Sequence, residues 1–141
     1  AKEVAEDLRR MLAGEPIDVF NHGKMQRDFT YIDDIVEGIT RLLPNPQKAD
    51  DGAPSKVYNI GNNSPEKLMT FITTLEAALS EALKREVVFK KVFEALKPGD
   101  VPATYASTDR LQEAVGFKPQ TSIKEGLSKF ARWYVDYYGV K

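Results

Sequence analysis

The chain has 141 residues, of which 42% are apolar, 29% charged and 10% aromatic, a composition typical of one folded domain. Its 20 Lys and Arg residues stand against 21 Asp and Glu residues, and the resulting net charge of −1 argues against nucleic-acid and membrane-surface binding. With no cysteine and a single histidine, the sequence excludes disulfides, thiolate metal sites and multi-histidine metal sites.

The first part of the chain predicts a helix followed by short extended segments. Residues 2–13 carry an apolar stripe with helical spacing, and Gly14 ends it. Because this start is acidic, it does not resemble a signal peptide. Residues 17–20 are expected to form a strand, residues 21–24 a turn and residues 28–31 a second extended segment.

A second helix is expected to begin at Asp33 or Asp34, where acidic side chains suit the positive end of the helix dipole. Its buried side should consist of Ile35, Ile39, Leu42 and Leu43. Residues 44–54 read as a polar, proline-bounded loop of variable length. No apolar run of the sequence is long enough to span a bilayer, so a cytoplasmic domain is expected.

The middle of the chain predicts a strand, a long helix and another strand. Residues 56–61 form the first strand, and Ser64 is expected to cap a helix that reaches about Lys84. Residues 86–92 should be extended. The apolar positions that should hold the long helix in the core are Leu68, Phe71, Ile72, Leu75, Ala78 and Leu79.

The last part predicts an irregular segment and two helices. Residues 96–101 contain a Pro-Gly turn, and Ser107 is expected to cap a short helix that stops at Gly116. Ser122 begins a capping box that opens the last helix. Helical spacing places its large apolar side chains in the core, namely Leu127, Phe130, Trp133, Tyr134 and Tyr137.

These elements predict a mixed, helix-rich α/β fold in which residues 1–141 form a single domain. The strands do not alternate with helices as in a complete doubly wound sheet, so the domain is expected to need a partner surface. No two of the nine glycines lie closer than nine positions, so neither a dinucleotide fingerprint nor a phosphate-binding P-loop can be written in this chain.

Two polar clusters are candidates for ligand binding. Arg27 ends a turn beside an extended segment, from which its planar guanidinium can reach a phosphate, or else it forms a surface ion pair with Asp28 or Asp33. The turn Lys97-Pro-Gly-Asp100 offers one donor and one acceptor beside backbone that a ligand can approach, or it is an ordinary connecting turn.

Four segments in order resemble the C-terminal, substrate-binding part of nucleotide-sugar epimerases. They are G-E-P-I-D-V-F-N-H-G-K-M-Q-R-D-F-T-Y-I-D-D-I, V-Y-N-I-G-N-N-S-P, K-P-G-D-V-P-A-T-Y-A-S-T-D-R-L and V-G-F-K-P-Q-T-S-I-K-E-G-L. These enzymes are extended short-chain dehydrogenases/reductases, and the resemblance is greatest to the UDP-glucuronate 4-epimerase branch. It implies that most of the Rossmann domain, with the NAD site and the catalytic Tyr/Lys pair, lies outside this chain.

The resemblance also implies roles for individual residues. Arg27 matches an arginine expected at the diphosphate, and Asp100 matches an acid placed to accept from a ribose hydroxyl or to hold its loop. Val19 and Phe20 match the strand that borders the uracil. Lys97 stands where relatives usually carry Arg or Gln, so it offers a single ammonium rather than a bidentate clamp.

The expected function is therefore to bind a UDP-sugar for an NAD-dependent 4-epimerase, while the chain alone binds no NAD and is inactive. Its expected partners are the UDP-sugar, the missing Rossmann domain and, in one version, a second copy in a homo-oligomer. Two alternatives stay open. The parent protein is a UDP-sugar decarboxylase or dehydratase of the same fold, or the chain is a non-catalytic binding or oligomerisation module.

Overall fold

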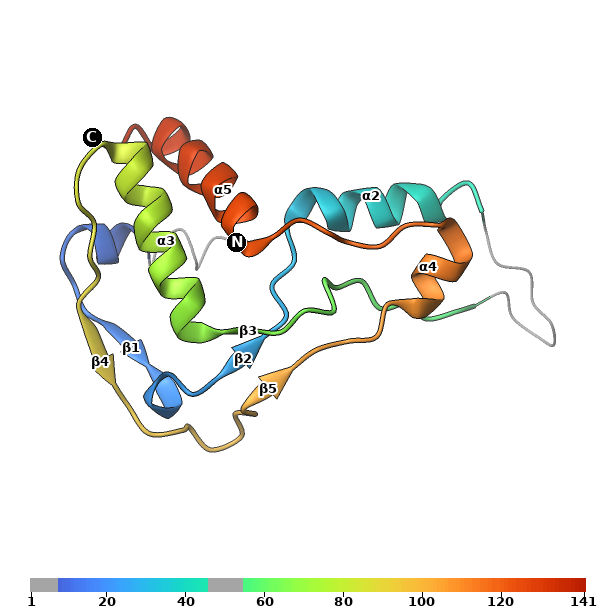
Figure 1. The fold of residues 1–141 in the computed structure, drawn as a ribbon, viewed down its shortest axis with the longest axis horizontal. Helices are drawn as coiled ribbons and strands as arrows, with labels where there is room; N and C mark the ends of the chain where they lie inside the picture. The colour runs from blue at the N-terminus through green and yellow to red at the C-terminus, as the bar shows by residue number, and fades with distance from the viewer. Residues whose placement is uncertain (1–7, 46–54) are drawn as a thin grey trace.

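The computed structural model describes residues 8–45 and 55–141. Residues 2–7 of the expected first helix and residues 46–54 of the expected loop lie outside this part. The described chain is elongated, with helices α3 and α5 side by side at one end and helices α2 and α4 at the other (Figure 1).

The end that contains α3 (Leu68–Leu83) and α5 (Ile123–Tyr138) holds the hydrophobic core. Residues 8–12 are helical, as expected, and Leu8 is buried there. Beside the helices, β1 (Ile17–Val19) pairs in parallel with β4 (Lys91–Phe93). The buried side chains at the centre of this core are Leu8, Val19, Ile72, Leu75, Ala78, Leu79, Val87, Phe89, Leu127, Ala131 and Tyr134.

Helix α3 confirms the predicted buried face but begins later than expected. Its N-cap is Lys67, without a side-chain cap bond, and the expected cap Ser64 instead donates its backbone N–H to Asp28 Oδ1 at 3.3 Å. The intervening residues form β3 (Glu66–Lys67), which pairs with a distant strand. Pairing between segments far apart in sequence therefore overrides the local capping signal.

A three-stranded sheet lies between the two ends of the molecule. Its central strand, β2 (Gln26–Arg27), pairs antiparallel with β3 and parallel with β5 (Ala103–Thr104). The extended segment expected at 28–31 is thus wrong in its bounds, because the ladder uses the two residues before it. Residues 28–31 carry the chain from this sheet into α2 (Figure 1).

Helix α2 (Ile32–Leu42) confirms the predicted helix, but of its predicted buried side chains only Ile35 and Leu42 are partly buried. Ile39 is 46% exposed and Leu43 is 73% exposed, and Gly38 is the buried residue of this helix. The large apolar side chains at helical spacing on this bare face are Ile32, Val36, Ile39 and Leu43. The periodicity identified an apolar face correctly, but the described residues contain no surface that covers it.

Two expected strands form only in part. Residues 56–61 are not assigned to a strand, and Val57 is 75% exposed. The strand expected over residues 86–92 is limited to β4, which extends one residue further. A β-strand needs hydrogen-bonding partners on a neighbouring strand, and among the described residues the segment 56–61 has none.

The helices of the last third agree with prediction except for one cap and two side chains. Helix α4 (Asp109–Val115) ends at Gly116, but Thr108 is its N-cap, one residue after Ser107. In α5, Ser122 Oγ accepts a hydrogen bond from Glu125 N at 3.2 Å, as a capping box requires. Trp133 and Tyr137 are 49% and 69% exposed, so the prediction that they pack in the core is wrong.

Candidate functional site

The strand β1 leads directly into a tight 3₁₀ turn, η1 (Phe20–Gly23), which presents Phe20. Three successive residues of this turn, Asn21, His22 and Gly23, have φ values of 49°, 49° and 77°, in the left-handed region. They redirect the chain from β1 into β2, which belongs to the other sheet. Val19, the last residue of β1, is 1% exposed and belongs to the hydrophobic core.

A second turn, at residues 97–100, lies against the first. Asp100 N donates to Lys97 O at 3.1 Å, and Gly99 has a φ of 90°, which glycine adopts without strain. The Nζ of Lys97 lies 3.9 Å from the centroid of the Phe20 ring, within cation–π range. Folding therefore brings together the turn from the first fifth of the chain and the Lys-Pro-Gly-Asp turn.

Arg27 ties the second turn to the three-stranded sheet. Its Nη1 donates to Gln26 O at 2.8 Å and to Val101 O at 3.0 Å. In the described part of the chain it forms no ion pair with Asp28 or Asp33, the alternative that its sequence context offered. These two bonds use only part of the five N–H donors of a guanidinium.

Asp28 holds Arg27's strand in place, a role that no sequence motif indicated. Its carboxylate accepts hydrogen bonds from Asn63 N at 3.0 Å and Ser64 N at 3.3 Å. Gly61 leaves room for that carboxylate, because a Cβ at this position would lie 2.7 Å from Asp28 Oδ2. The strand that carries Arg27 is thus fixed on one side by its neighbouring strands and on the other by the turn at residues 61–64.

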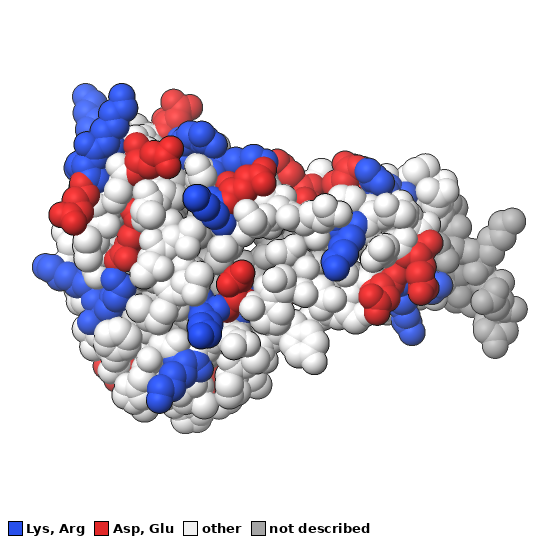
Figure 2. Space-filling model, in the orientation of Figure 1, with Lys and Arg blue, Asp and Glu red and all other residues white. Residues whose placement is uncertain are grey.

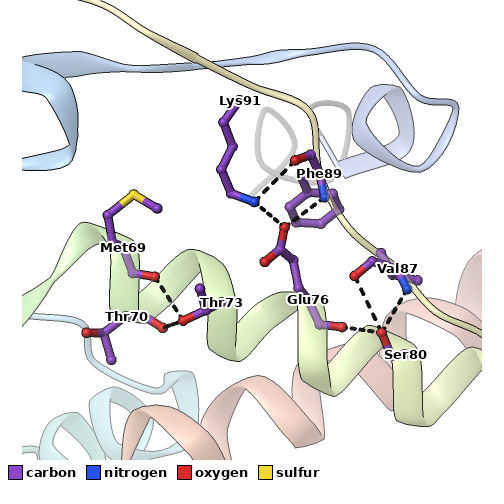
Figure 3. Close-up of polar contacts among 8 residues, drawn as sticks. All are labelled: Met69, Thr70, Thr73, Glu76, Ser80, Val87, Phe89 and Lys91. Carbon is purple, nitrogen blue, oxygen red and sulfur yellow. Dashed lines mark hydrogen bonds and ion pairs between the residues drawn. The ribbon is translucent and has the colours of Figure 1, made fainter.

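The segment before the second turn is anchored to α3 by a largely buried ion pair (Figure 3). Glu76 Oε1 accepts from Lys91 Nζ at 2.5 Å and from Phe89 N at 2.7 Å. On the same side, Ser80 Oγ accepts from Val87 N at 2.9 Å. The backbone from residue 87 to residue 91 is therefore held on the helix surface, and it continues through β4 to Lys97. Glu76 and Lys91 carry no sequence signal of this pairing, because fifteen positions separate them.

The charge of the site is mixed rather than strongly basic. Arg27 and Lys97 supply two cations and Asp100 supplies an exposed carboxylate. Figure 2 shows acidic and basic side chains interspersed over the face in view. Among residues 8–45 and 55–141, no group of three or more His, Cys, Asp and Glu residues is placed to hold a metal ion, and no helix is long and apolar enough to cross a membrane.

The described residues contain no glycine-rich turn of the kind that binds dinucleotides in Rossmann folds. A Rossmann site needs a glycine-rich turn that leads from a parallel strand straight into a helix N-terminus. Here β1 leads into η1, and β4 leads into the irregular segment that contains Lys97. The glycines with positive φ lie in separate turns, at Gly14, Gly23, Gly99, Gly116 and Gly139. A glycine-rich turn of the Rossmann type is therefore absent from this part of the chain.

Comparison with known proteins relates the chain to nucleotide-sugar enzymes. Residues 1–61 match the NAD dependent epimerase/dehydratase family. Over 88% of its length the chain is 46% identical to Protein CapI of Staphylococcus aureus, of which it covers 39%. Over 89% of its length it is 41% identical to a probable UDP-glucuronate 4-epimerase of Rhizobium meliloti, of which it also covers 39%. The chain thus spans about two fifths of the length of these curated relatives.

A solved structure agrees with this relationship. MoeE5 in complex with UDP-glucuronic acid and NAD superposes with a TM-score of 0.69 at 27% identity, over 92% of this chain and 40% of that one. The partial coverage and the helix-rich α/β fold agree with the expected C-terminal region, which lacks most of the Rossmann domain. The chain is therefore similar to part of the nucleotide-sugar epimerases, and its residues 1–61 match the NAD dependent epimerase/dehydratase family.

Proposed function

We propose that this chain is the UDP-sugar-binding part of an NAD-dependent 4-epimerase that acts on UDP-glucuronate or UDP-galacturonate. The observation that carries the proposal is the meeting of the two turns. An aromatic ring, Phe20, and two cations, Lys97 and Arg27, lie along adjoining segments, as a nucleoside diphosphate requires. The names of a curated relative and of a solved complex support the choice of UDP-glucuronate.

Each residue has a distinct part in this proposal. Phe20 borders the base, with Val19 behind it, and the guanidinium of Arg27 donates to the diphosphate through the N–H groups that the backbone carbonyls do not use. Lys97 adds a second positive charge, and Asp100 accepts from a ribose hydroxyl. Binding of the UDP moiety anchors the substrate while its sugar ring rotates in the pocket. The binding energy of the UDP moiety is thus used to position the sugar.

The cofactor and the catalytic residues belong to the remainder of the protein in this proposal. Residues 1–141 then act as one substrate-binding domain of a cytoplasmic enzyme, with a variable loop near 44–54, and they are inactive alone. The missing domain covers the bare face of α2 and adds strands beside residues 56–61. The exposure of Ile39, Leu43 and Val57 supports this arrangement, because large apolar patches on a surface mark interfaces.

The bare face also favours one alternative, in which a second copy of this chain covers α2 and the protein is a binding or oligomerisation module. A decarboxylase or dehydratase of the same fold would differ in residues outside the chain, so product analysis of the whole protein separates it from an epimerase.

The direct test is a titration of the 141-residue chain with UDP and, separately, with NAD, followed by amide chemical shifts. We expect UDP alone to shift resonances, clustered at Phe20, Arg27 and Asp100. Sedimentation of the same sample distinguishes the oligomerisation module, which would self-associate without binding UDP. Tight NAD binding or epimerase turnover by this chain would contradict the proposal.

A substitution at Arg27 tests the proposed phosphate contact. Arg27→Ala should weaken UDP binding by about 1.5–3 kcal/mol, the usual contribution of a hydrogen bond to a charged group. Arg110→Ala is the matched control, because Arg110 is an exposed arginine on α4, far from the two turns. A loss below about 0.5 kcal/mol for Arg27→Ala would show that this side chain only supports the loop.

A further inference from the structure

The contact between Lys97 and Phe20 is framed by backbone hydrogen bonds on both sides. Glu94 N donates to Val19 O at 3.0 Å, and His22 N donates to Glu94 O at 2.9 Å, which fixes the first turn against the segment leading to the second. On the C-terminal side of Lys97, the hydrogen bond from Arg27 Nη1 to Val101 O fixes the backbone that follows the second turn. The backbone positions of Phe20 and Lys97 are therefore set by the fold rather than by their own contact.

The side chain of Lys97, in contrast, has few constraints. It is exposed to solvent, and in the described part of the chain no carboxylate forms an ion pair with it. Its ammonium group lies on the ring face of Phe20, which is itself half-buried and so offers a limited aromatic surface. Rotation about the bonds of its flexible four-carbon side chain can move the ammonium group from this ring to a different partner at a small cost in free energy.

We propose that Lys97 makes the site selective for nucleoside diphosphates over nucleosides, by exchanging the ring of Phe20 for a phosphate when the ligand binds. This inference rests on the proposed function, since it assumes that the base lies against Phe20. In this arrangement the base stacks on the ring face that Lys97 covers, which a base and an ammonium group cannot share. A nucleoside must therefore displace Lys97, whose ammonium group then exchanges its aromatic contact for water.

A nucleoside diphosphate displaces Lys97 in the same way but gives its ammonium group a new anionic partner. Every ligand whose base displaces Lys97 thus loses the free energy of the cation–π contact. Only a ligand that carries a phosphate offsets this loss, by forming a new contact with the ammonium group. Lys97 therefore contributes to the selectivity for nucleoside diphosphates in two ways: its contact with Phe20 disfavours nucleosides, and its contact with the phosphate favours diphosphates.

The test compares uridine and UDP on the 141-residue chain and on Lys97→Met, which keeps the apolar stem and removes the charge. Uridine should bind Lys97→Met about two- to fivefold more tightly, the factor that corresponds to an exposed cation–π contact. UDP should bind it more weakly, so that the ratio of UDP to uridine affinity falls by about tenfold or more. Lys124→Met, which removes an exposed charge at the start of α5, should change neither affinity.

Proton NMR supplies a second measurement that does not depend on affinity. In the ligand-free chain the ε-methylene protons of Lys97 should be shifted upfield by the Phe20 ring, and either ligand should remove this shift. Phe20→Leu should remove it without ligand, which assigns the signal.

The outcomes separate the inference from the proposed function. If the chain binds UDP but Lys97→Met weakens uridine and UDP by the same factor, or leaves uridine unchanged, the selectivity inference is overturned and the proposed function stands. If neither uridine nor UDP binds at millimolar concentration, both are overturned.

Discussion

Removing Glu76 tests whether the ion pair on α3 fixes the segment that leads to the second turn. Glu76 and Lys91 are 13% and 17% exposed at their side chains, and Glu76 Oε1 also accepts from Phe89 N. Glu76→Ala therefore leaves an ammonium group and a backbone N–H in a mostly water-free environment. Breaking one partner of a buried pair costs about 3–5 kcal/mol, and partial exposure places this one near the lower end, at about 3 kcal/mol.

The double variant separates the pairwise attraction from the cost of an orphaned charge. In Glu76→Leu/Lys91→Met neither charge remains, so its loss should be smaller than the sum of the losses of Glu76→Leu and Lys91→Met by about 1–3 kcal/mol. Urea unfolding, followed by far-ultraviolet circular dichroism and by the fluorescence of Trp133, the single tryptophan, measures each loss. Lys129→Met is the matched control, because the ion pair between Lys129 and Glu125 lies at the surface. The midpoint of urea unfolding of this variant should equal that of the unchanged protein. A loss below about 1 kcal/mol for Glu76→Ala would refute the reasoning, since the pair would then behave as a surface contact.

Two further substitutions test other parts of the molecule. Gly61→Ala should cost about 1–3 kcal/mol in urea unfolding, because the new Cβ displaces the Asp28 carboxylate from its two backbone donors. In a protein that also carries Asp28→Ser, Gly61→Ala should reduce the free energy of unfolding much less. An equal reduction in both backgrounds would contradict the clash between the new Cβ and the Asp28 carboxylate. Burial raises the pKa of Tyr134, so its neutral phenol is favoured in the folded state and stability should fall as pH rises above about 10, where the unfolded chain ionises. Tyr134→Phe should make the fall between pH 9 and pH 11 shallower, whereas an identical fall in both proteins would contradict this assignment.

The helices could be predicted well because their signals are local. The apolar spacing of α3 correctly identified Ile72, Leu75 and Leu79 as buried, and Ser122 correctly marked the start of α5. What the spacing could not supply is the surface against which each apolar face packs. Ile39 and Trp133 were therefore assigned to the core on the same grounds as Leu79, although the described residues leave both exposed.

The short strands and the site contacts depend on segments that are distant in sequence. Ser64 has the local features of a helix cap, but its N–H bonds to Asp28 and the helix begins at Leu68. Two separate sequence motifs indicated Phe20 and Lys97 as candidate site residues. Only the folded structure shows that the two side chains are in contact. Their roles toward a ligand stay predictions, which the uridine and UDP titrations test.

The sheet centred on β2 is one of the links between the two ends of the molecule, and it uses very little backbone. Its ladder consists of bonds such as Gln26 N to Pro102 O at 2.8 Å, Asp28 N to Thr104 O at 3.2 Å and Leu68 N to Met25 O at 2.9 Å. Each strand of this sheet is two residues long, whereas α3 and α5 share an extensive core. The sheet should therefore open at lower free energy than the core unfolds, in a sub-global fluctuation with its boundary at β2. Arg27 lies on that boundary, so a ligand that binds Arg27 would suppress this opening and couple the motions of the two ends.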